Sequence, residues 1–142
     1  MHRMEHIMVR DVMIREFPRV KHTDNVTEII RVAEANPDLE SLSVMNRENH
    51  LVGIIREEDL HRVLGSDISR NILNADDIAL TSPLSVSPDE NFLEALRDFG
   101  SRDIETLPVE TGESNNRRLV GLLLRADVMR RYRQEMLRSH CR

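Results

Sequence analysis

A ten-residue string occurs twice in this chain, and the repeat restricts the fold more than any other feature. Residues 51–60 read LVGIIREEDL, and residues 119–128 read LVGLLLRADV. The first half of each string is apolar, which is typical of a strand that is buried on both faces. The second half is polar and carries an aspartate, Asp59 or Asp127, near the start of a predicted helix. We therefore expect two copies of one structural unit.

The similarity extends upstream of the string. Residues 17–30, FPRVKHTDNVTEII, align with residues 83–96, PLSVSPDENFLEAL. In both copies an asparagine, Asn25 or Asn91, precedes apolar residues at helical spacing, and a glutamate follows it three residues later. This pattern predicts a capped helix in each copy, because asparagine accepts hydrogen bonds from the first turn and the glutamate can complete a capping box.

The order of elements follows from the same alignment. We expect the first helix to stop at Pro37 and the second at Gly100. Each is followed by a short strand (SLSVM or TLPVE), a polar turn, the repeated string and a second helix. Each copy therefore reads strand, helix, strand, strand, helix. Since a half of about 60 residues buries little core alone, the two copies predict one α/β fold with a pseudo-two-fold axis.

Composition narrows the functional class. The chain has 142 residues, of which 39% are hydrophobic and 32% charged, as in soluble globular proteins. Its longest apolar run is far shorter than the roughly 20 residues of a membrane span, and its start lacks a signal peptide, so we expect a cytoplasmic protein with no direct membrane span. A net charge of −5 and 3% aromatic residues argue against a nucleic-acid partner.

The tags LVGIIREED and LVGLLLRAD, in this order of elements, resemble the CBS domain, a module that occurs in tandem pairs. The resemblance places repeat 1 at residues 7–65, a linker at 66–75 and repeat 2 at 76–137. The segments VRDVMIREFPRV, DNVTEII and RRLVGLLLRADVMRRY are most similar to the cytoplasmic C-terminal CBS pair of bacterial chloride-channel-type membrane proteins.

This resemblance implies a regulatory, ligand-sensing (Bateman) module and no enzyme activity. Such pairs bind adenosine-containing ligands, namely AMP, ADP, ATP or S-adenosylmethionine, in clefts between the repeats, and they need no cofactor or metal. The ligand modulates an attached or partner protein, here a chloride channel or another ion transporter. The resemblance also implies a homodimer through helix faces, for which we expect the exposed apolar residues Leu60, Leu64, Val128 and Tyr132 to supply contacts. The alternative is a CBS dimerisation platform that has lost its ligand.

The end of each string is the candidate ligand site. Gly53 and Gly121 permit close backbone approach, and the N–H groups of the following helix can bind an anionic phosphate. Asp59 and Asp127 lie in or beside the first turn of that helix, where a carboxylate can accept hydrogen bonds from a ribose diol. The same carboxylate would also stabilise the helix start without any ligand.

The string departs from the family pattern three residues before each aspartate. A serine or threonine that bonds ribose or phosphate is usual there, whereas this chain has Arg56 in one copy and Leu124 in the other. Leucine makes no polar contact, so we expect weak or no nucleotide binding at that site. Arg56 either pairs with a phosphate or is a solvated residue at the helix start.

An adenine ring would need an aliphatic slot. The candidates are Val20, Ile54 and Ile55 in the first copy and Val86, Leu122 and Leu123 in the second, and each of them also suits a plain core position. The N-terminal HRMEH matches the H-x-x-E-H pattern of some zinc peptidases, but it lies where chains fray and we expect no metal site.

Overall fold

The computed structural model describes residues 3–65, 71–81, 83–113 and 116–140. The chain forms two compact units, and neither is one continuous stretch of sequence. Unit 1 comprises Met1–Phe17, Leu84–Gly112 and Leu119–Arg142, and unit 2 comprises Pro18–Pro83 with Glu113–Arg118.

Unit 2 contains a four-stranded sheet with the strand order β1-β2-β3-β4. Its strands are β1 (Arg19–Lys21), β2 (Ser41–Met45), β3 (Leu51–Arg56) and β4 (Leu80–Thr81). Strands β1 and β2 are parallel, whereas β3 is antiparallel to both β2 and β4. The apolar string therefore forms an interior strand, as the sequence predicts.

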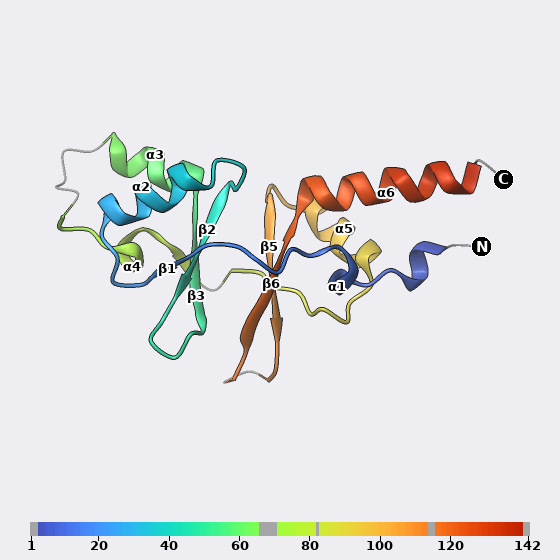
Figure 1. The fold of residues 1–142 in the computed structure, drawn as a ribbon, viewed down its shortest axis with the longest axis horizontal. Coiled ribbons are helices and arrows are strands. Elements are labelled where there is room, and N and C mark those ends of the chain that lie inside the picture. The colour runs from blue at the N-terminus through green and yellow to red at the C-terminus, as the bar shows by residue number, and fades with distance from the viewer. Residues whose placement is uncertain (1–2, 66–70, 82, 114–115, 141–142) are drawn as a thin grey trace. The chain divides into compact units, whose positions relative to one another are not determined.

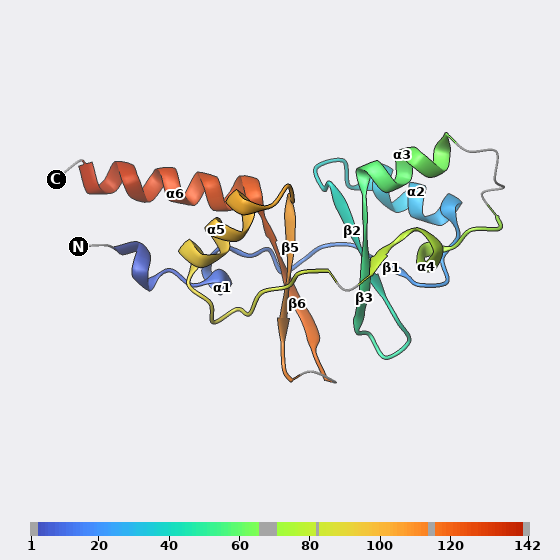
Figure 2. The ribbon, with the colours of Figure 1, turned by 180° about the vertical axis from the view of Figure 1, so that it is seen from behind.

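Three helices complete unit 2: α2 (Val26–Ala35), α3 (Glu57–Leu64) and α4 (Ala75–Ile78). Figures 1 and 2 show α2 and α3 side by side on one face of the sheet. Between helices and sheet lies a cluster of buried aliphatic side chains that includes Val20, Ile29, Val44 and Ile55. This cluster is the core of unit 2.

Unit 1 is built from η1 (Arg3–His6), α1 (Val9–Val12), α5 (Phe92–Ser101), β5 (Thr106–Thr111), β6 (Arg118–Leu124) and α6 (Arg125–His140). Strands β5 and β6 form a two-stranded sheet. Single bridges extend it: Val86 pairs in parallel with Val109, and Ile14 pairs with Leu122. The predicted order of elements is thus confirmed, although the leading strand of the second copy is reduced to the bridge at Val86.

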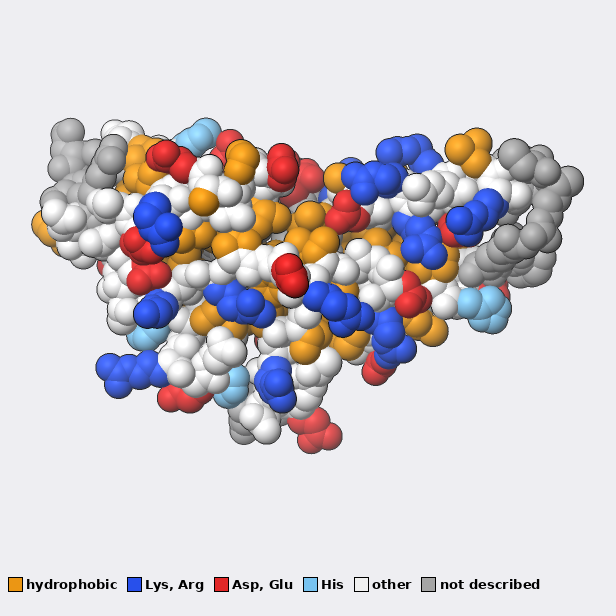
Figure 3. All heavy atoms as spheres, in the orientation of Figure 1, with side chains coloured by type: hydrophobic (Ala, Val, Ile, Leu, Met, Phe, Trp, Pro, Cys, Tyr) orange, Lys and Arg blue, Asp and Glu red, His pale blue; other side chains and the backbone are white. Residues whose placement is uncertain are grey.

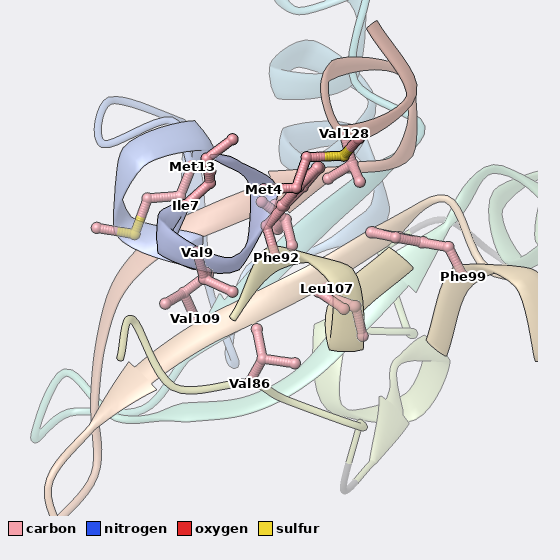
Figure 4. Close-up of a cluster of buried hydrophobic side chains, with 12 residues drawn as sticks. Met4, Ile7, Val9, Met13, Val86, Phe92, Phe99, Leu107, Val109 and Val128 are labelled. Carbon is pink, nitrogen blue, oxygen red and sulfur yellow. The ribbon is translucent and has the colours of Figure 1, made fainter. Parts of the chain in front are cut away.

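The core of unit 1 is made by residues from both ends of the chain. Figure 4 shows Val9 of α1 close to Val109 of β5, with Phe92 of α5 in the same cluster. Val128 of α6 belongs to it too and is fully buried. The expectation that Val128 is an exposed dimer contact is therefore wrong, because the side chain fills the core of its own unit.

Each copy contributes its leading segment to the unit of the other copy. The backbone N–H of Val9 in α1 donates to the carbonyl of Glu90 at 2.8 Å, which ties the first helix to the second copy. The N–H of Ala75 in α4 likewise donates to the carbonyl of Asp24 at 2.8 Å, which ties the leading helix of the second copy to the first copy. The exchange is symmetrical, since both segments precede their strand by the same number of residues.

The two string glycines lie where these exchanged segments pass. A Cβ atom at Gly53 would lie 2.8 Å from the carbonyl oxygen of Leu80, and one at Gly121 would lie 2.9 Å from that of Ile14. Both distances are too short for a side chain, so the predicted close backbone approach is confirmed.

The predicted helix ends are partly right. The side chain of Asn25 caps α2 by accepting from the N–H of Glu28 at 3.0 Å, and the helix ends at Ala35, two residues before Pro37. Asn91 caps α5 through the N–H of Leu93 at 2.8 Å. However, α5 continues past Gly100 to Ser101.

In the described ranges, no helix combines the length and the apolar character that crossing a membrane would require.

Candidate functional site

Asp59 and Arg56 are bound to each other at the start of α3. One carboxylate oxygen of Asp59 accepts from the backbone N–H of Arg56 at 2.9 Å and from its Nε at 3.0 Å. The other oxygen accepts from Nη2 of Arg56 at 2.9 Å and from Nη2 of Arg62 at 3.1 Å. Both oxygens are therefore engaged within the first turns of the helix.

Burial and charge act in opposite directions on this carboxyl group. Asp59 is only 2% exposed, and burial by itself raises its pKa. The hydrogen bonds and positive charge of Arg56, with Arg62 adding to them, outweigh burial and hold the pKa of Asp59 below its usual range. The group is thus an anion that is compensated by two arginines.

The start of α3 is a poor place for a phosphate. Glu57, Glu58 and Asp59 all lie in its first turn, and negative charge there opposes an incoming anion. Arg56 is also paired with Glu58, with 3.2 Å between Nη1 and the carboxylate oxygen. The Arg56 side chain is 36% exposed, and its guanidinium is paired with the carboxylates of Glu58 and Asp59.

Asp127 lies in a different environment in the second copy. It is in the first turn of α6, its side chain is 23% exposed, and one oxygen accepts from Nη1 of Arg130 at 3.0 Å. No second hydrogen bond to its carboxylate is found in the described part of the chain. Leu124, three residues before Asp127, is the last residue of β6. The side chain of the following residue, Arg125, donates to the carbonyl of Phe99 at 3.1 Å.

The aliphatic candidates divide between the two faces of each sheet. Val20 and Ile55 belong to the core of unit 2, whereas Ile54 is buried but lies outside that cluster. The corresponding residues of unit 1 divide in the same way. Val86 and Leu123 belong to the core of unit 1, and Leu122 is buried but lies outside that cluster. Neighbouring residues of a strand face opposite sides, so Ile54 and Leu122 lie on the sheet face opposite to that of the core residues Ile55 and Leu123.

Unit 2 contains a basic hollow that sequence reasoning missed. It has a volume of about 520 Å³ and is lined by β1 and by the turns after β1 and β2, including the basic residues Arg19, Lys21, His22 and Arg47. Figure 3 shows blue and pale blue side chains around the end of the β2–β3 hairpin. The sequence feature that could have predicted the hollow is the basic segment RVKH in the first copy, which aligns with the uncharged SVSP in the second copy.

A second concave surface, the helix groove, lies between α2 and α3. Its volume is about 620 Å³, and its lining includes Ile30, Ala33, Leu60 and Leu64. Leu64 is 43% exposed, and Leu60 is packed partly against the core. Of the two remaining predicted dimer contacts, Val128 is core and Tyr132 packs partly against the core of unit 1.

The HRMEH segment gives no support for a metal site. His2 lies outside the described residues, and Arg3–His6 forms the short helix η1. Among the residues that the structure describes, no group of three or more histidine, cysteine or acidic side chains could hold a metal ion.

Solved structures share this fold over nearly the whole chain. A putative acetoin utilization protein from Vibrio cholerae has a TM-score of 0.77 and 22% identity, covering 94% of this chain and 96% of its own. CBSX2 in complex with AMP has a TM-score of 0.72 and 23% identity, with coverage of 89% and 96%. The CBS domain pair of protein MJ0100, in complex with 5′-methylthioadenosine and S-adenosyl-L-methionine, has a TM-score of 0.73 and 20% identity, with coverage of 91% and 98%.

Among curated proteins, no sequence matches this one. The CBS domain family model, in contrast, matches twice, at residues 9–66 and at residues 75–134. These two matches account for most of the chain and fall on the two copies of the repeat. The chain therefore belongs to the CBS domain family and consists of a tandem pair of CBS repeats.

Proposed function

We propose that this chain is a regulatory module that binds an adenosine-containing ligand and thereby modulates an attached or partner protein. The observation that carries the proposal is the double CBS match, together with the AMP and the S-adenosyl-L-methionine held by two structures of the same fold. The ligand of this module is an adenosine-containing nucleotide, namely AMP, ADP or ATP, or S-adenosylmethionine.

Within that proposal, Asp127 is the ribose contact. Its carboxylate is partly exposed, and within the described residues it is bound only by Arg130, so an oxygen remains to accept from a ribose hydroxyl. Asp59 serves the start of α3, because Arg56 and Arg62 already occupy both of its oxygens. Leu124 lacks the hydroxyl that would bond ribose or phosphate, so the affinity is modest.

Thermal unfolding with a panel of adenosine, AMP, ATP and S-adenosylmethionine tests this. A ligand at 100 times its dissociation constant stabilises the folded state by about 2.7 kcal/mol, which is a readily measured shift. The Asp127→Asn variant should lose most of the shift, and Asp103→Asn, an exposed aspartate of the same unit, should keep it. Absence of a shift with every ligand at millimolar concentration would contradict the proposal.

A structural dimerisation platform is the second candidate. The engagement of Asp59 with Arg56 and the leucine at position 124 favour it, because both remove polar groups that a ligand would use. The homodimer itself is common to both candidates, and we propose the helix groove between α2 and α3 as its contact, with Leu64 at the surface.

Sedimentation analysis tests the dimer contact. Leu64→Glu places a charge in the helix groove and should convert a dimer to a monomer. Ile72→Glu makes the same change at a residue of the same unit that is 72% exposed and lies outside the groove, so it should leave the dimer intact. A wild-type monomer at high protein concentration would contradict the contact.

The regulated partner, we propose, is a membrane channel or transporter of the chloride-channel type. The support is the likeness of the VRDVMIREFPRV and RRLVGLLLRADVMRRY segments to CBS pairs of such proteins. The gene that encodes this chain, or its immediate neighbour, should then encode membrane-spanning channel segments. A neighbourhood of cytosolic enzymes alone would contradict this part of the proposal.

A further inference from the structure

We propose that the basic hollow of unit 2 is a second binding site, separate from the adenosine site, and that it takes a pyrophosphate group. The hollow lies at the carboxyl ends of β1 and β2, which meet at one edge of the sheet because the two strands are parallel. Its lining comes from two segments that are separate in the sequence, namely the end of β1 around Lys21 and the turn around Arg47.

The turn that carries Arg47 is held in a defined shape. The N–H of His50 donates to the side-chain oxygen of Asn46 at 2.9 Å, and the N–H of Asn49 donates to the carbonyl of Asn46 at 3.0 Å. Asn49 has a φ of 64°, a left-handed conformation that asparagine tolerates. The rim of the hollow is therefore largely preformed, which lowers the entropic cost of binding.

The charge of the hollow exceeds what its own acids neutralise. Asp76 binds Nδ1 of His22 at 2.8 Å, and Asp24 accepts from the backbone N–H of Lys21 at 2.8 Å. Within the described residues, neither the Lys21 ammonium nor the Arg47 guanidinium forms an ion pair with a carboxylate. Two exposed cations that face one open volume favour a compact polyanion rather than a single carboxylate.

Size and apolar lining agree with a small ligand. A volume of about 520 Å³ lies within the usual range for small-molecule sites, roughly 300–1,000 Å³. The buried side chains of Val20 and Met45 also line the hollow, so a pyrophosphate attached to an organic group could be held as well. The site differs in chemistry from the surroundings of Asp127, where a carboxylate would receive a ribose.

The second copy shows that the charge is not a by-product of the repeat. Val86 pairs with Val109 in parallel, as Val20 pairs with Val44, so the two strand ends are structurally equivalent. The positions that correspond to the basic residues of the hollow carry Ser85, Ser87, Pro88 and Gly112. One copy of a common scaffold thus has basic residues at four positions where the corresponding residues of the other copy are uncharged.

Titration calorimetry on the full chain with inorganic pyrophosphate tests the proposal. The Lys21→Gln/Arg47→Gln variant should bind roughly tenfold more weakly or worse, because it loses two charge-assisted contacts. Arg97→Gln/Arg133→Gln, which removes the same charge from exposed positions of unit 1, should bind as the wild type does. Equal weakening in both variants, or no binding at millimolar pyrophosphate, would overturn the site.

Backbone amide NMR locates the site and separates it from the proposed adenosine site. Pyrophosphate should shift the amide signals of Lys21, His22 and Asn49, whereas adenosine, which has no phosphate, should not. ADP distinguishes a free pyrophosphate from one carried by a nucleoside: shifts at these amides with pyrophosphate alone assign the free anion, and shifts with both assign the shared group. Shifts confined to the surroundings of Asp127 would contradict the second site and leave the proposed function intact.

Discussion

Arg56 and Asp59 form a closed arrangement at the start of α3, in which one arginine reaches a buried aspartate through its backbone N–H and through two guanidinium nitrogens. The arginine occupies the N-cap position, where a short polar residue is usual. Asp59, at the third helical position, accepts from the backbone N–H of this cap residue and from its guanidinium group. The pair is a structural device of unit 2.

Asp59→Asn should destabilise the protein. The neutral amide loses the ion pairs with Arg56 and Arg62 in a buried position, and we expect a loss of about 1–3 kcal/mol in the free energy of unfolding. Asp127→Asn removes a partly exposed ion pair and should cost less than about 1 kcal/mol. Urea denaturation of both variants provides the comparison, and equal losses would contradict the structural role of Asp59.

The contribution of Asp59 should depend on pH in a defined direction. Its folded-state pKa is lowered, so its stabilising effect is complete above the unfolded pKa of about 3.9 and is lost as the pH falls through the lower folded value. The stability difference between wild type and Asp59→Asn should therefore be constant near neutral pH and shrink in acid. A difference that grows on acidification would show that the sign is wrong.

Glu90 should behave in the opposite way. Burial raises its pKa, and the negative charges of Asp98 and Glu94 raise it further, so the ionised form is disfavoured in the folded state. Glu90→Gln should consequently stabilise the protein at neutral pH, and the gain should vanish below the unfolded pKa of about 4.3. Glu16→Gln, at an exposed position, is the charge-matched control in the same thermal unfolding series.

Gly53→Ala should be much more harmful than Gly100→Ala. The new methyl group at position 53 would meet the backbone carbonyl of Leu80, which cannot move without disturbing the β3–β4 pairing, and overpacking costs about 1–3 kcal/mol. Nothing lies within 4 Å of the corresponding position at Gly100, and alanine is the better helix former by up to about 1 kcal/mol. Guanidinium denaturation should rank the two variants on opposite sides of the wild type.

Replacing the two capping asparagines, Asn25 and Asn91, by aspartate should affect the stability of the protein differently. Both residue types cap helices about equally well, so Asn25→Asp should change stability by less than about 0.5 kcal/mol. The amide of Asn91 also donates to the carbonyls of Met4 and Glu5, at 3.3 and 2.7 Å, and aspartate cannot. Asn91→Asp should cost about 1–3 kcal/mol in urea denaturation, and similar values for both variants would contradict these contacts.

Local pattern was sufficient for much of the fold. The apolar string predicted the interior strand β3, Gly53 predicted a close backbone approach, and Asn25 predicted the start of α2. Gly100 misled because a single glycine within a helix costs only about 1 kcal/mol, which the packing of Phe99 and its neighbours outweighs. The error at Val128 came from treating a helix face as exposed before its packing partners were known.

The remaining features depend on contacts that an alignment of the copies does not contain. Sequence alignment shows which residues correspond in the two copies but not which unit a segment packs in, so it could not predict the exchange of α1 and α4. The basic hollow requires the parallel pairing of β1 with β2, which places Lys21 near Arg47. Arg56 was expected to bind a phosphate or to be solvated, and neither alternative included an ion pair with the aspartate of its own string.

The exchanged segments also set the order in which the chain can fold as it is synthesised. Unit 2 consists almost entirely of residues 18–83. Most of the residues that pack together in this unit are therefore synthesised before the rest of the second copy. The helix α1 is synthesised before unit 2, yet Val9 must wait for the backbone of Glu90 and for the core around Phe92 and Val109. The contacts of α1 are therefore completed only after this part of the second copy has been synthesised.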